Sequence, residues 1–422
     1  MKFKYGKGVR NLELPPDAKI EKVEPKPLEP ILDLEEALTA SLDSPIGSVS
    51  LKDFAADKKK LTVIVPDKTR SAGITELIPL LMKYLKTWAK RDTEVSLLVA
   101  NGMHLKATED ELDMLLTREV RKEYQVIQHD ASDTSSMVML GETSRGTPVQ
   151  VNKIAGDADG LILTGSITFH YFAGFTGGRK AFLPGVASKE SIVANHKLTV
   201  SGGKGKGGTS MTGILEGNPV HEDMIEAVRF AKPAFLVNTI TNAEGRIAKF
   251  FCGDVEKAHR DGTRKVMEAF STKLKRKADL VVAGCGGFPK DMNFIQAHKA
   301  LHHAFQSVKE GGTLVLAAEC SEGIGSETFL PYFQLADSGQ IRESLMQEYT
   351  LNGHTALATL DKAERCNIVL LSELDGDVVT LMRMEPANGP EEVMEKATAS
   401  LPEKSLVYVM PEAALMFVSH ES

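Results

Sequence analysis

Four short segments of the chain carry reactive side chains next to glycines or strand-like runs. They are PDKTR at 66–70, NGMH at 101–104, GSITFHYFAGFTGGRK at 165–180 and NHK at 195–197. In α/β proteins, polar residues that directly follow strands or sit in glycine-rich turns lie where ligands bind. We therefore expect these segments to build a site.

The PDKTR segment offers groups that suit an anion. Asp67 can cap the helix that follows, and Thr69 can donate a hydrogen bond to a phosphate or sugar oxygen. Arg70 carries a planar guanidinium, which binds a carboxylate or phosphate through two parallel hydrogen bonds. The alternative is a capped helix start with a solvated arginine.

Three histidines lie in the other segments. His104 ends a glycine-containing turn, His170 precedes the glycine-rich turn, and His196 lies beyond it. Imidazole has a pKa near working pH, which suits proton transfer and metal binding. Taken singly, His104 is more often a structural residue and His196 more often a helix-surface residue, so each depends on its neighbours for a functional interpretation.

Strands and helices alternate along the sequence, which predicts an α/β fold with mostly parallel sheets flanked by helices. The expected strands are β-branched or leucine-rich runs at 61–65, 95–100, 160–163, 235–240, 280–283, 313–317, 367–371 and 406–410. The expected helices have apolar residues at helical spacing and lie at 76–90, 220–231, 255–270, 294–310 and 391–400.

The polar, basic stretch 271–277 is the expected seam between two domains. We therefore assign residues 1–273 to an N-terminal cofactor-binding domain and 274–422 to a C-terminal α/β domain that closes over the substrate. The active site is expected in the cleft between them.

Composition narrows the class of protein. The 422 residues are 42% hydrophobic and 25% charged, with a net charge of −7, which argues against a nucleic-acid partner. Residues 1–14 contain no apolar run of signal-peptide length, and the sequence contains no apolar run of the about 20 residues that a membrane span needs. A cytoplasmic enzyme is expected. The cysteines occur singly, which predicts neither a disulfide scaffold nor a structural zinc site.

The sequence matches neither of two familiar nucleotide-binding motifs. The turn at 284–289, GCGGFP, lacks the third glycine of a dinucleotide-binding fingerprint. In the glycine loop at 201–210, Gly207 follows Lys206 where a P-loop needs serine or threonine. A Rossmann dehydrogenase and a P-loop NTPase are therefore disfavoured.

Taken together, the reactive segments resemble the nickel-pincer lactate racemase family, and the resemblance covers almost the whole chain. The matching strings are PDKTR, NGMH, SITFHYFAGFTGGRKAFLPG at 166–185, NHK and, in the second half, FIQAHK at 294–299. The resemblance implies a nickel-pincer nucleotide, pyridinium-3-thioamide-5-thiocarboxylic acid mononucleotide. Its nickel is bound by one carbon and two sulfurs of the cofactor and by one protein histidine.

The family's functional residues can be placed one by one on this sequence. Lys180 matches the lysine that takes the cofactor covalently as a thioamide, and His196 matches the nickel ligand. His104 and His170 match the paired acid and base. The loop that holds the mononucleotide and helps place the substrate corresponds to Asp67, Lys68, Thr69 and Arg70.

The chemistry explains these residue types. To invert a carbon that bears hydroxyl, hydrogen and carboxylate, a site can remove hydride while a base takes the hydroxyl proton. Hydride then rejoins the planar 2-keto acid from either face, so two bases are needed. Arg70 or Lys299 can anchor the substrate carboxylate, and the amide of Gln296 can hydrogen-bond to it.

The sequence departs from the family pattern beside the expected substrate. Ile295 stands where the lactate racemase has a tyrosine, and the second-domain tryptophan of that pocket is missing, with Asn352, Gly353 and His354 near its place. His354 either contacts a different substrate tail or caps the helix that follows. We expect a pocket that prefers a 2-hydroxy acid longer than lactate.

The sequence thus predicts an isomerase, a racemase or epimerase of a small-molecule 2-hydroxy acid, loaded by cofactor biosynthesis proteins. It gives no indication of oligomeric state. One alternative keeps the cofactor and changes the substrate to a sugar acid or dicarboxylic hydroxy acid. A second is a non-catalytic nickel-cofactor-binding protein, which would have no need of His104 and His170. A zinc hydrolase is disfavoured, because H-E-x-x-H is missing.

Overall fold

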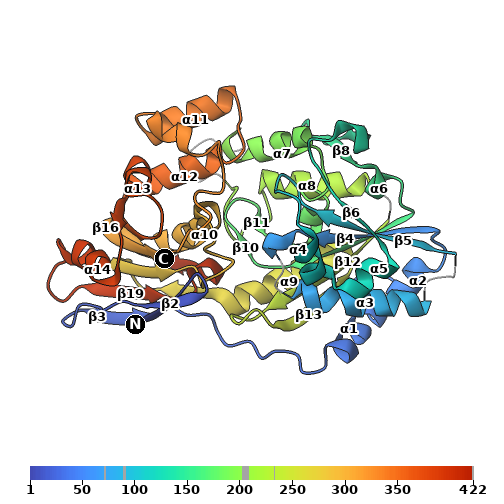
Figure 1. The fold of residues 1–422 in the computed structure, drawn as a ribbon, viewed down its shortest axis with the longest axis horizontal. Helices are drawn as coiled ribbons and strands as arrows, with labels where there is room; N and C mark the ends of the chain where they lie inside the picture. Colours follow the sequence, from blue (N-terminus) through green and yellow to red (C-terminus); the bar gives the residue numbers. More distant parts are fainter. Residues whose placement is uncertain (71–72, 89–91, 202–208, 232, 421–422) are drawn as a thin grey trace. The chain divides into compact units, whose positions relative to one another are not determined.

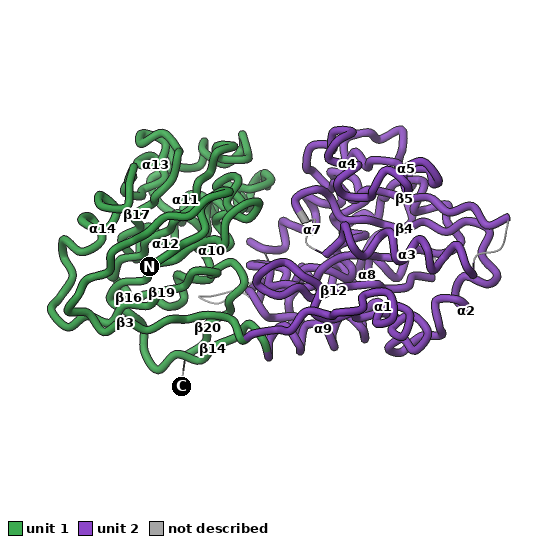
Figure 2. The backbone as a smooth tube through the Cα atoms, turned by 60° about the horizontal axis from the view of Figure 1, so that its bottom comes forward, with its two compact units in different colours: residues 1–26, 269–422 green, residues 27–268 purple. Residues whose placement is uncertain are grey.

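The computed structural model describes residues 1–422 except 71–72, 89–91, 202–208, 232 and 421–422 (Figure 1). The side chains of residues 70 and 201 also lie outside the described part. It divides into two compact units, Pro27–Glu268 and Met1–Lys26 with Ala269–Ser422 (Figure 2). In the described residues each unit contains a six-stranded, parallel-rich sheet with flanking helices. The predicted α/β class is confirmed.

The sheet of the unit Pro27–Glu268 has the strand order β13-β12-β9-β4-β5-β6. Neighbouring strands are parallel except for the antiparallel pair β12 and β13. The strands are β4 (Lys60–Pro66), β5 (Glu94–Ala100), β6 (Gln125–Gln128), β9 (Gly160–Ser166), β12 (Ala234–Thr241) and β13 (Ile247–Gly253). The central strands are almost continuously apolar because both faces of the sheet are covered.

Helices and two small hairpins complete this unit. The helices are α1 (Leu34–Asp43), α2 (Leu51–Ala55), α3 (Ile74–Trp88), α4 (Glu109–Leu116), α5 (Arg118–Glu123), α6 (Lys153–Gly156), α7 (Lys189–Ser201), α8 (Pro219–Arg229) and α9 (Val255–Phe270). The hairpins pair β7 (Met137–Glu142) with β8 (Pro148–Asn152) and β10 (Phe169–His170) with β11 (Gly174–Phe175). Leu77 and Leu81 of α3 pack with Val63 and Val65 of β4 in one buried core.

The other unit contains an all-parallel sheet with the order β18-β17-β16-β15-β19-β3. Its strands are β3 (Lys19–Lys22), β15 (Ala278–Gly284), β16 (Val308–Ala317), β17 (Asn367–Leu371), β18 (Glu385–Ala387) and β19 (Leu406–Met410). Its helices are α10 (Phe294–Phe305), α11 (Ser338–Gln347), α12 (Gly353–Ala363), α13 (Gly376–Leu381) and α14 (Pro390–Thr398). Two further pairs are β1 (Lys2–Tyr5) with β2 (Gly8–Asn11) and β14 (Ser271–Leu274) with β20 (Phe417–His420).

One predicted helix is too long. The apolar spacing indicated a helix over 294–310, but α10 ends at Phe305 and β16 already begins at Val308. Val308 pairs with Ala278 of β15 instead, because sheet pairing decides whether a locally ambiguous run becomes helix or strand. Within the described part of the chain, no helix is long and apolar enough to cross a membrane.

Candidate active site

Three of the four reactive segments follow adjacent strands of one sheet. β4 lies between β5 and β9, with Pro66 opposite Ala100 and Ile64 opposite Leu163. Because these strands are parallel, the segments that follow them leave from the same edge of the sheet. The sheet topology therefore brings the PDKTR loop, the NGMH turn and the glycine-rich segment to the same edge of the sheet.

Asp67 joins two of these loops. Its Oδ1 accepts hydrogen bonds from the Thr69 backbone N–H at 2.7 Å and the Thr69 hydroxyl at 2.5 Å. Its Oδ2 lies 3.1 Å from Nδ1 of His104. The Asp67 side chain is 5% exposed and that of His104 is 43% exposed. Asp67 thus caps a 3₁₀ turn, Lys68–Arg70, rather than α3, and orients the imidazole of His104.

Lys68 lies in an ion pair at the same edge. Its Nζ is 2.8 Å from both carboxylate oxygens of Glu111, and the hydrogen bond from Lys68 holds the pKa of Glu111 below its ordinary value. Glu111 also closes a capping box with Thr108 at the start of α4. Lys68 therefore ties the PDKTR loop to α4. The side chain of Arg70, predicted to bind cofactor and substrate, lies outside the described residues.

The glycine-rich turn needs its glycines for conformation and space. Gly177 and Gly178 have φ of 72° and 56°, where L side chains are strained. A Cβ on Gly177 would lie 2.6 Å from Oδ1 of Asn238, the same atom that accepts a hydrogen bond from the Gly178 N–H at 2.7 Å. Asn238 of β12 thereby holds the turn that leads to Lys180.

Arg179 and Lys180 have different surroundings although they are neighbours. Arg179 is fully buried, and its guanidinium donates to the carbonyls of Ala173 at 2.6 Å and Phe175 at 2.9 Å. It also lies 3.1 Å from Nε2 of His259. Burial lowers the pKa of Arg179 to about 9. Arg179 thus connects backbone carbonyls of the glycine-rich segment through hydrogen bonds.

Phe172, which the sequence analysis did not single out, contacts three predicted functional side chains. Its ring lies edge-on to His170 with centroids 4.5 Å apart, and edge-on to His196 at 5.0 Å. The Nζ of Lys180 is 5.5 Å from the centre of the same ring. An amine and two imidazoles therefore meet around one aromatic side chain. The sequence feature that could have identified Phe172 is its position as an aromatic residue between His170 and the glycine-rich turn.

The two histidines that contact Phe172 are held in different ways. The backbone N–H of Ala173 donates to Nδ1 of His170 at 3.3 Å, within the β10–β11 hairpin. His196 lies on α7 and is mostly buried, so the alternative of a surface helix residue is wrong. The preceding residue, Asn195, donates from Nδ2 to Asp223 of α8 at 2.8 Å, which sets the rotation of α7.

In the other unit, Gln296 and Lys299 lie on the first turns of α10. Asn293 caps this helix by accepting from the Gln296 N–H at 3.0 Å. Lys299 donates from Nζ to Oε1 of Gln296 at 2.5 Å, and both side chains are half-buried. The Gln296 amide and the Lys299 ammonium therefore form one hydrogen-bonded pair.

His354 is a buried residue of α12. The helix is preceded by Asn352 as its N-cap residue, so the alternative that His354 caps it is wrong. Nδ1 of His354 is hydrogen-bonded to the hydroxyl of Tyr349, and the two rings are stacked with centroids 5.8 Å apart and planes at 9°. Tyr349 therefore fixes the plane of the imidazole.

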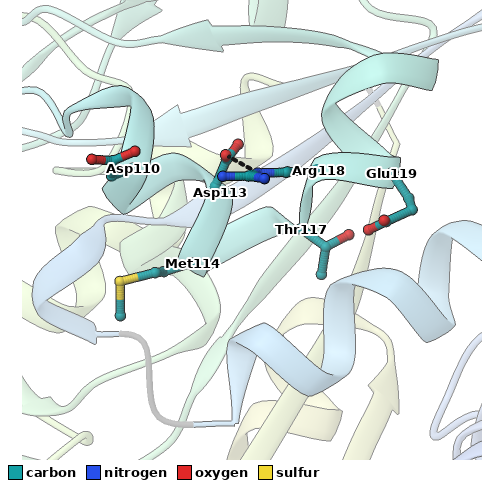
Figure 3. Close-up of a pocket in the computed structure, with 6 residues that line it drawn as sticks. All are labelled: Asp110, Asp113, Met114, Thr117, Arg118 and Glu119. Atoms are coloured by element: carbon teal, nitrogen blue, oxygen red, sulfur yellow. Dashed lines mark hydrogen bonds and ion pairs between the residues drawn. The ribbon is translucent and has the colours of Figure 1, made fainter.

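A surface pocket is lined by residues outside these segments. Figure 3 shows that it is formed by α4, α5 and the residue between them, with an ion pair of 2.7 Å between Arg118 and Asp113 inside it. Its lining is Asp110, Asp113, Met114, Thr117, Arg118 and Glu119. It contains no predicted site residue. Among the described residues, no group of three or more His, Cys, Asp or Glu could hold a metal ion.

Comparisons with known proteins identify relatives along the whole chain. The Lactate racemase N-terminal domain family matches residues 5–207 and the Lactate racemase C-terminal domain family matches residues 273–418. Lactate racemase of Lactiplantibacillus plantarum is 36% identical over 386 residues, 90% of this chain and 89% of that protein. Lactate racemase of Thermoanaerobacterium thermosaccharolyticum is 35% identical over 300 residues, 71% of this chain and 69% of that protein.

Two solved structures are similar in fold. The lactate racemase apoprotein from Thermoanaerobacterium thermosaccharolyticum superposes with a TM-score of 0.90 at 29% identity and covers 99% of both chains. A protein from Thermotoga maritima superposes with a TM-score of 0.70 at 15% identity, over 92% of this chain and 98% of that one. The second likeness shows the fold alone.

Proposed function

The chain belongs to the lactate racemase family and is an isomerase of the racemase class, and from that premise we propose its substrate, its cofactor and the residues that act on them. The proposed reaction is racemisation or epimerisation of a lactate-type 2-hydroxy acid. The proposed cofactor is the nickel-pincer nucleotide, bound covalently through Lys180 and loaded by cofactor biosynthesis proteins.

The observation that carries this proposal is the cluster around Phe172. Lys180, His196 and His170 all lie beside its ring, so the residues proposed as attachment point, metal ligand and base are neighbours of one side chain. This donor set fits a nickel cofactor that is tethered by an amine and needs a single imidazole from the protein. When bound, the cofactor supplies an electron sink that accepts hydride from the substrate carbon and returns it.

The protein's part at the cofactor is attachment and orientation. We assign the Lys180 amine to the covalent link and the His196 imidazole to nickel. The hydroxyl of Thr69 and the guanidinium of Arg70 are assigned to the mononucleotide, with Asp67 holding their turn in shape. A role for Lys68 at the mononucleotide requires its ammonium to leave Glu111 or to be shared with it.

His104 and His170 are assigned to proton transfer. In both residues Nδ1 already has a partner, Asp67 Oδ2 for His104 and the Ala173 N–H for His170. For His104 we therefore assign the substrate hydroxyl proton to Nε2. The neutral ring of His170 carries its proton on Nε2 while Nδ1 accepts from the Ala173 N–H, so His170 takes up a substrate proton only when it gives up that hydrogen bond. One imidazole takes the proton from one enantiomer, the other takes it from its mirror image, and each returns it in the reverse direction.

Substrate binding is assigned to the polar side chains that the family resemblance indicates. Arg70 or Lys299 anchors the substrate carboxylate, with the Gln296 amide hydrogen-bonded to it. His354 is assigned to the substrate tail, which favours an acid longer than lactate. A sugar acid and a dicarboxylic hydroxy acid are the alternatives within the same mechanism.

The test is a racemisation screen of enantiopure 2-hydroxy acids with protein produced together with the cofactor biosynthesis enzymes. We expect the loaded protein to racemise at least one acid. Replacing His104 or His170 by alanine should lower that rate by a factor on the order of 10² while cofactor loading stays intact. Racemisation at normal rates in both single variants would show that these imidazoles are not the acid and base.

A further inference from the structure

A buried histidine outside the proposed catalytic set holds the start of the His104 turn. His129 directly follows β6 and is 0% exposed. Its backbone N–H donates to the carbonyl of Val99 at 3.0 Å, and its own carbonyl accepts from Nδ2 of Asn101 at 2.8 Å. Asn101 begins the turn that ends at His104, where the His104 N–H donates back to the Asn101 carbonyl at 2.8 Å.

The ring of His129 is bound on both nitrogens. Nε2 lies 2.9 Å from the carbonyl oxygen of Ala187, and Nδ1 lies 3.5 Å from Nδ2 of Asn152. A carbonyl only accepts, so Nε2 carries the proton and Nδ1 is the acceptor. Burial lowers the pKa of His129, which keeps the ring in this neutral state. The ring is therefore a fixed link from β6 to the segment that follows Lys180.

A second link runs between the same two segments. The Gly102 N–H donates to the carbonyl of Gly185 at 2.9 Å, and the Gly185 N–H donates to the carbonyl of Lys180 at 3.1 Å. Gly102 makes this contact with φ of 53°. The His104 turn is thus bonded to the segment 180–187 at two places, through Gly102 and through Asn101 with His129.

We propose that His129 is a positioning residue that sets the His104 turn against the segment 180–187 and so fixes the acid–base imidazole relative to Lys180. This inference rests on the proposed function of His104 and Lys180. Its effect is on rate, because a displacement of about 1 Å between a catalytic group and the reacting atoms costs a factor on the order of 10². His129 acts through His104 and touches no substrate.

The first test uses the loaded enzyme. His129→Leu should lower kcat by a factor on the order of 10 to 10², while the mass adduct at Lys180 is unchanged. His129→Gln should recover much of the rate, because its amide can donate to Ala187. Asn101→Ala breaks the same link from the other side and should give a similar loss. Unchanged kcat in both His129→Leu and Asn101→Ala would overturn the proposal.

A control separates positioning from loss of stability. Tyr84→Phe removes a hydrogen bond of 2.5 Å to Asp43 in the same unit, on the α3 helix, and should lower the melting temperature without lowering kcat. In the unloaded protein, hydrogen exchange of the peptide 101–105 should speed up in His129→Leu and stay unchanged in Tyr84→Phe. Equal exchange in both variants would contradict a link through His129.

A double-mutant cycle tests whether His129 acts through His104. In a His104→Ala background, His129→Leu should have little further effect on the residual kcat, whereas in a His170→Ala background its effect should persist. Equal effects in both backgrounds would overturn the proposal. Full activity of His104→Ala itself would instead refute the proposed function, so the two failures are distinguishable.

Discussion

Nδ1 of His104 lies 3.1 Å from Oδ2 of Asp67, although the two residues are 37 positions apart in the sequence. Their loops meet because β4 and β5 pair in parallel with Pro66 opposite Ala100. A buried carboxylate beside a more exposed imidazole fixes the ring plane and the nitrogen that bears the proton. The family resemblance placed Asp67 with the cofactor, and the geometry adds an orienting role.

Replacing Asp67 by asparagine should keep the bond from Thr69 but present an N–H to Nδ1 of His104. We expect racemisation to fall by a factor on the order of 10² because the ring is held in the wrong tautomer. Asp110→Asn, an exposed acid on α4, is the matched control and should leave the rate unchanged. If Asp67→Asn instead prevents the Lys180 adduct, the carboxylate serves cofactor binding and not the orientation of His104.

Substitutions of Lys180 and His196 should have different effects on the cofactor: the first on its covalent attachment and the second on its nickel content. Intact-mass analysis should show an adduct on the loaded protein that Lys180→Ala abolishes and that the exposed-lysine control Lys189→Ala retains. His196→Ala should keep the organic adduct and lose most of the nickel, measured by elemental analysis, because a single imidazole is the assigned protein ligand. An adduct that survives in Lys180→Ala would refute the assignment.

Acid should destabilise the unit that holds the glycine-rich segment. Burial and the neighbouring Arg179 lower the pKa of His259 to about 3 and that of His221 to about 2. Between pH 6.5 and 3 the unfolded chain binds protons at these sites and the folded chain does not, so stability falls as pH falls. Each such histidine contributes a slope on the order of 1.4 kcal/mol per pH unit.

Denaturant unfolding of the unloaded protein at pH 7, 5.5 and 4.5 measures this slope. His259→Gln has an amide that can still donate to the carbonyl of Thr176, which lies 2.8 Å from the histidine Nε2, but it does not titrate. We expect a shallower dependence on pH in this variant by about one proton. An unchanged slope in His259→Gln would contradict the prediction.

His354 should decide substrate preference. A pocket that hydrogen-bonds a polar tail rejects a substrate without that tail, because its polar groups are then left without partners. Lactate should therefore be a poor substrate, and His354→Trp should lower kcat/KM for the preferred acid more than for lactate. Met346→Trp adds an indole at an exposed site of α11 and should change no preference. Lactate as the best acid in the screen would disprove this role.

Much of the fold and site follows from local sequence. Runs such as 61–65 and 95–100 are apolar and β-branched, and they become β4 and β5, because strands covered on both faces need continuous apolar character. Because these strands can be recognised in the sequence, the positions of the reactive segments directly after them could be predicted as well. The family resemblance then supplied roles for Lys180 and His196 that spacing alone could not.

Only the tertiary structure decided which side chains meet. Strand register brings Asp67 to His104, and the packing of Phe172 against His170, His196 and Lys180 joins residues up to 26 positions apart. Sequence pattern reports whether a side chain is apolar and how it repeats, and it carries no information on partners in other strands and helices.

The same limit explains the remaining differences. Arg179 and Lys180 look alike in sequence and are both buried. The guanidinium of Arg179 donates to the hairpin carbonyls of Ala173 and Phe175, whereas the amine of Lys180 lies over the ring of Phe172. Residues Met1–Lys26 join the unit Ala269–Ser422 because β3 pairs with β19, with Lys19 opposite Leu406. The two paired strands lie almost at opposite ends of the chain. Long-range hydrogen bonding and core packing select this pairing, and a local stretch of sequence carries no information on either.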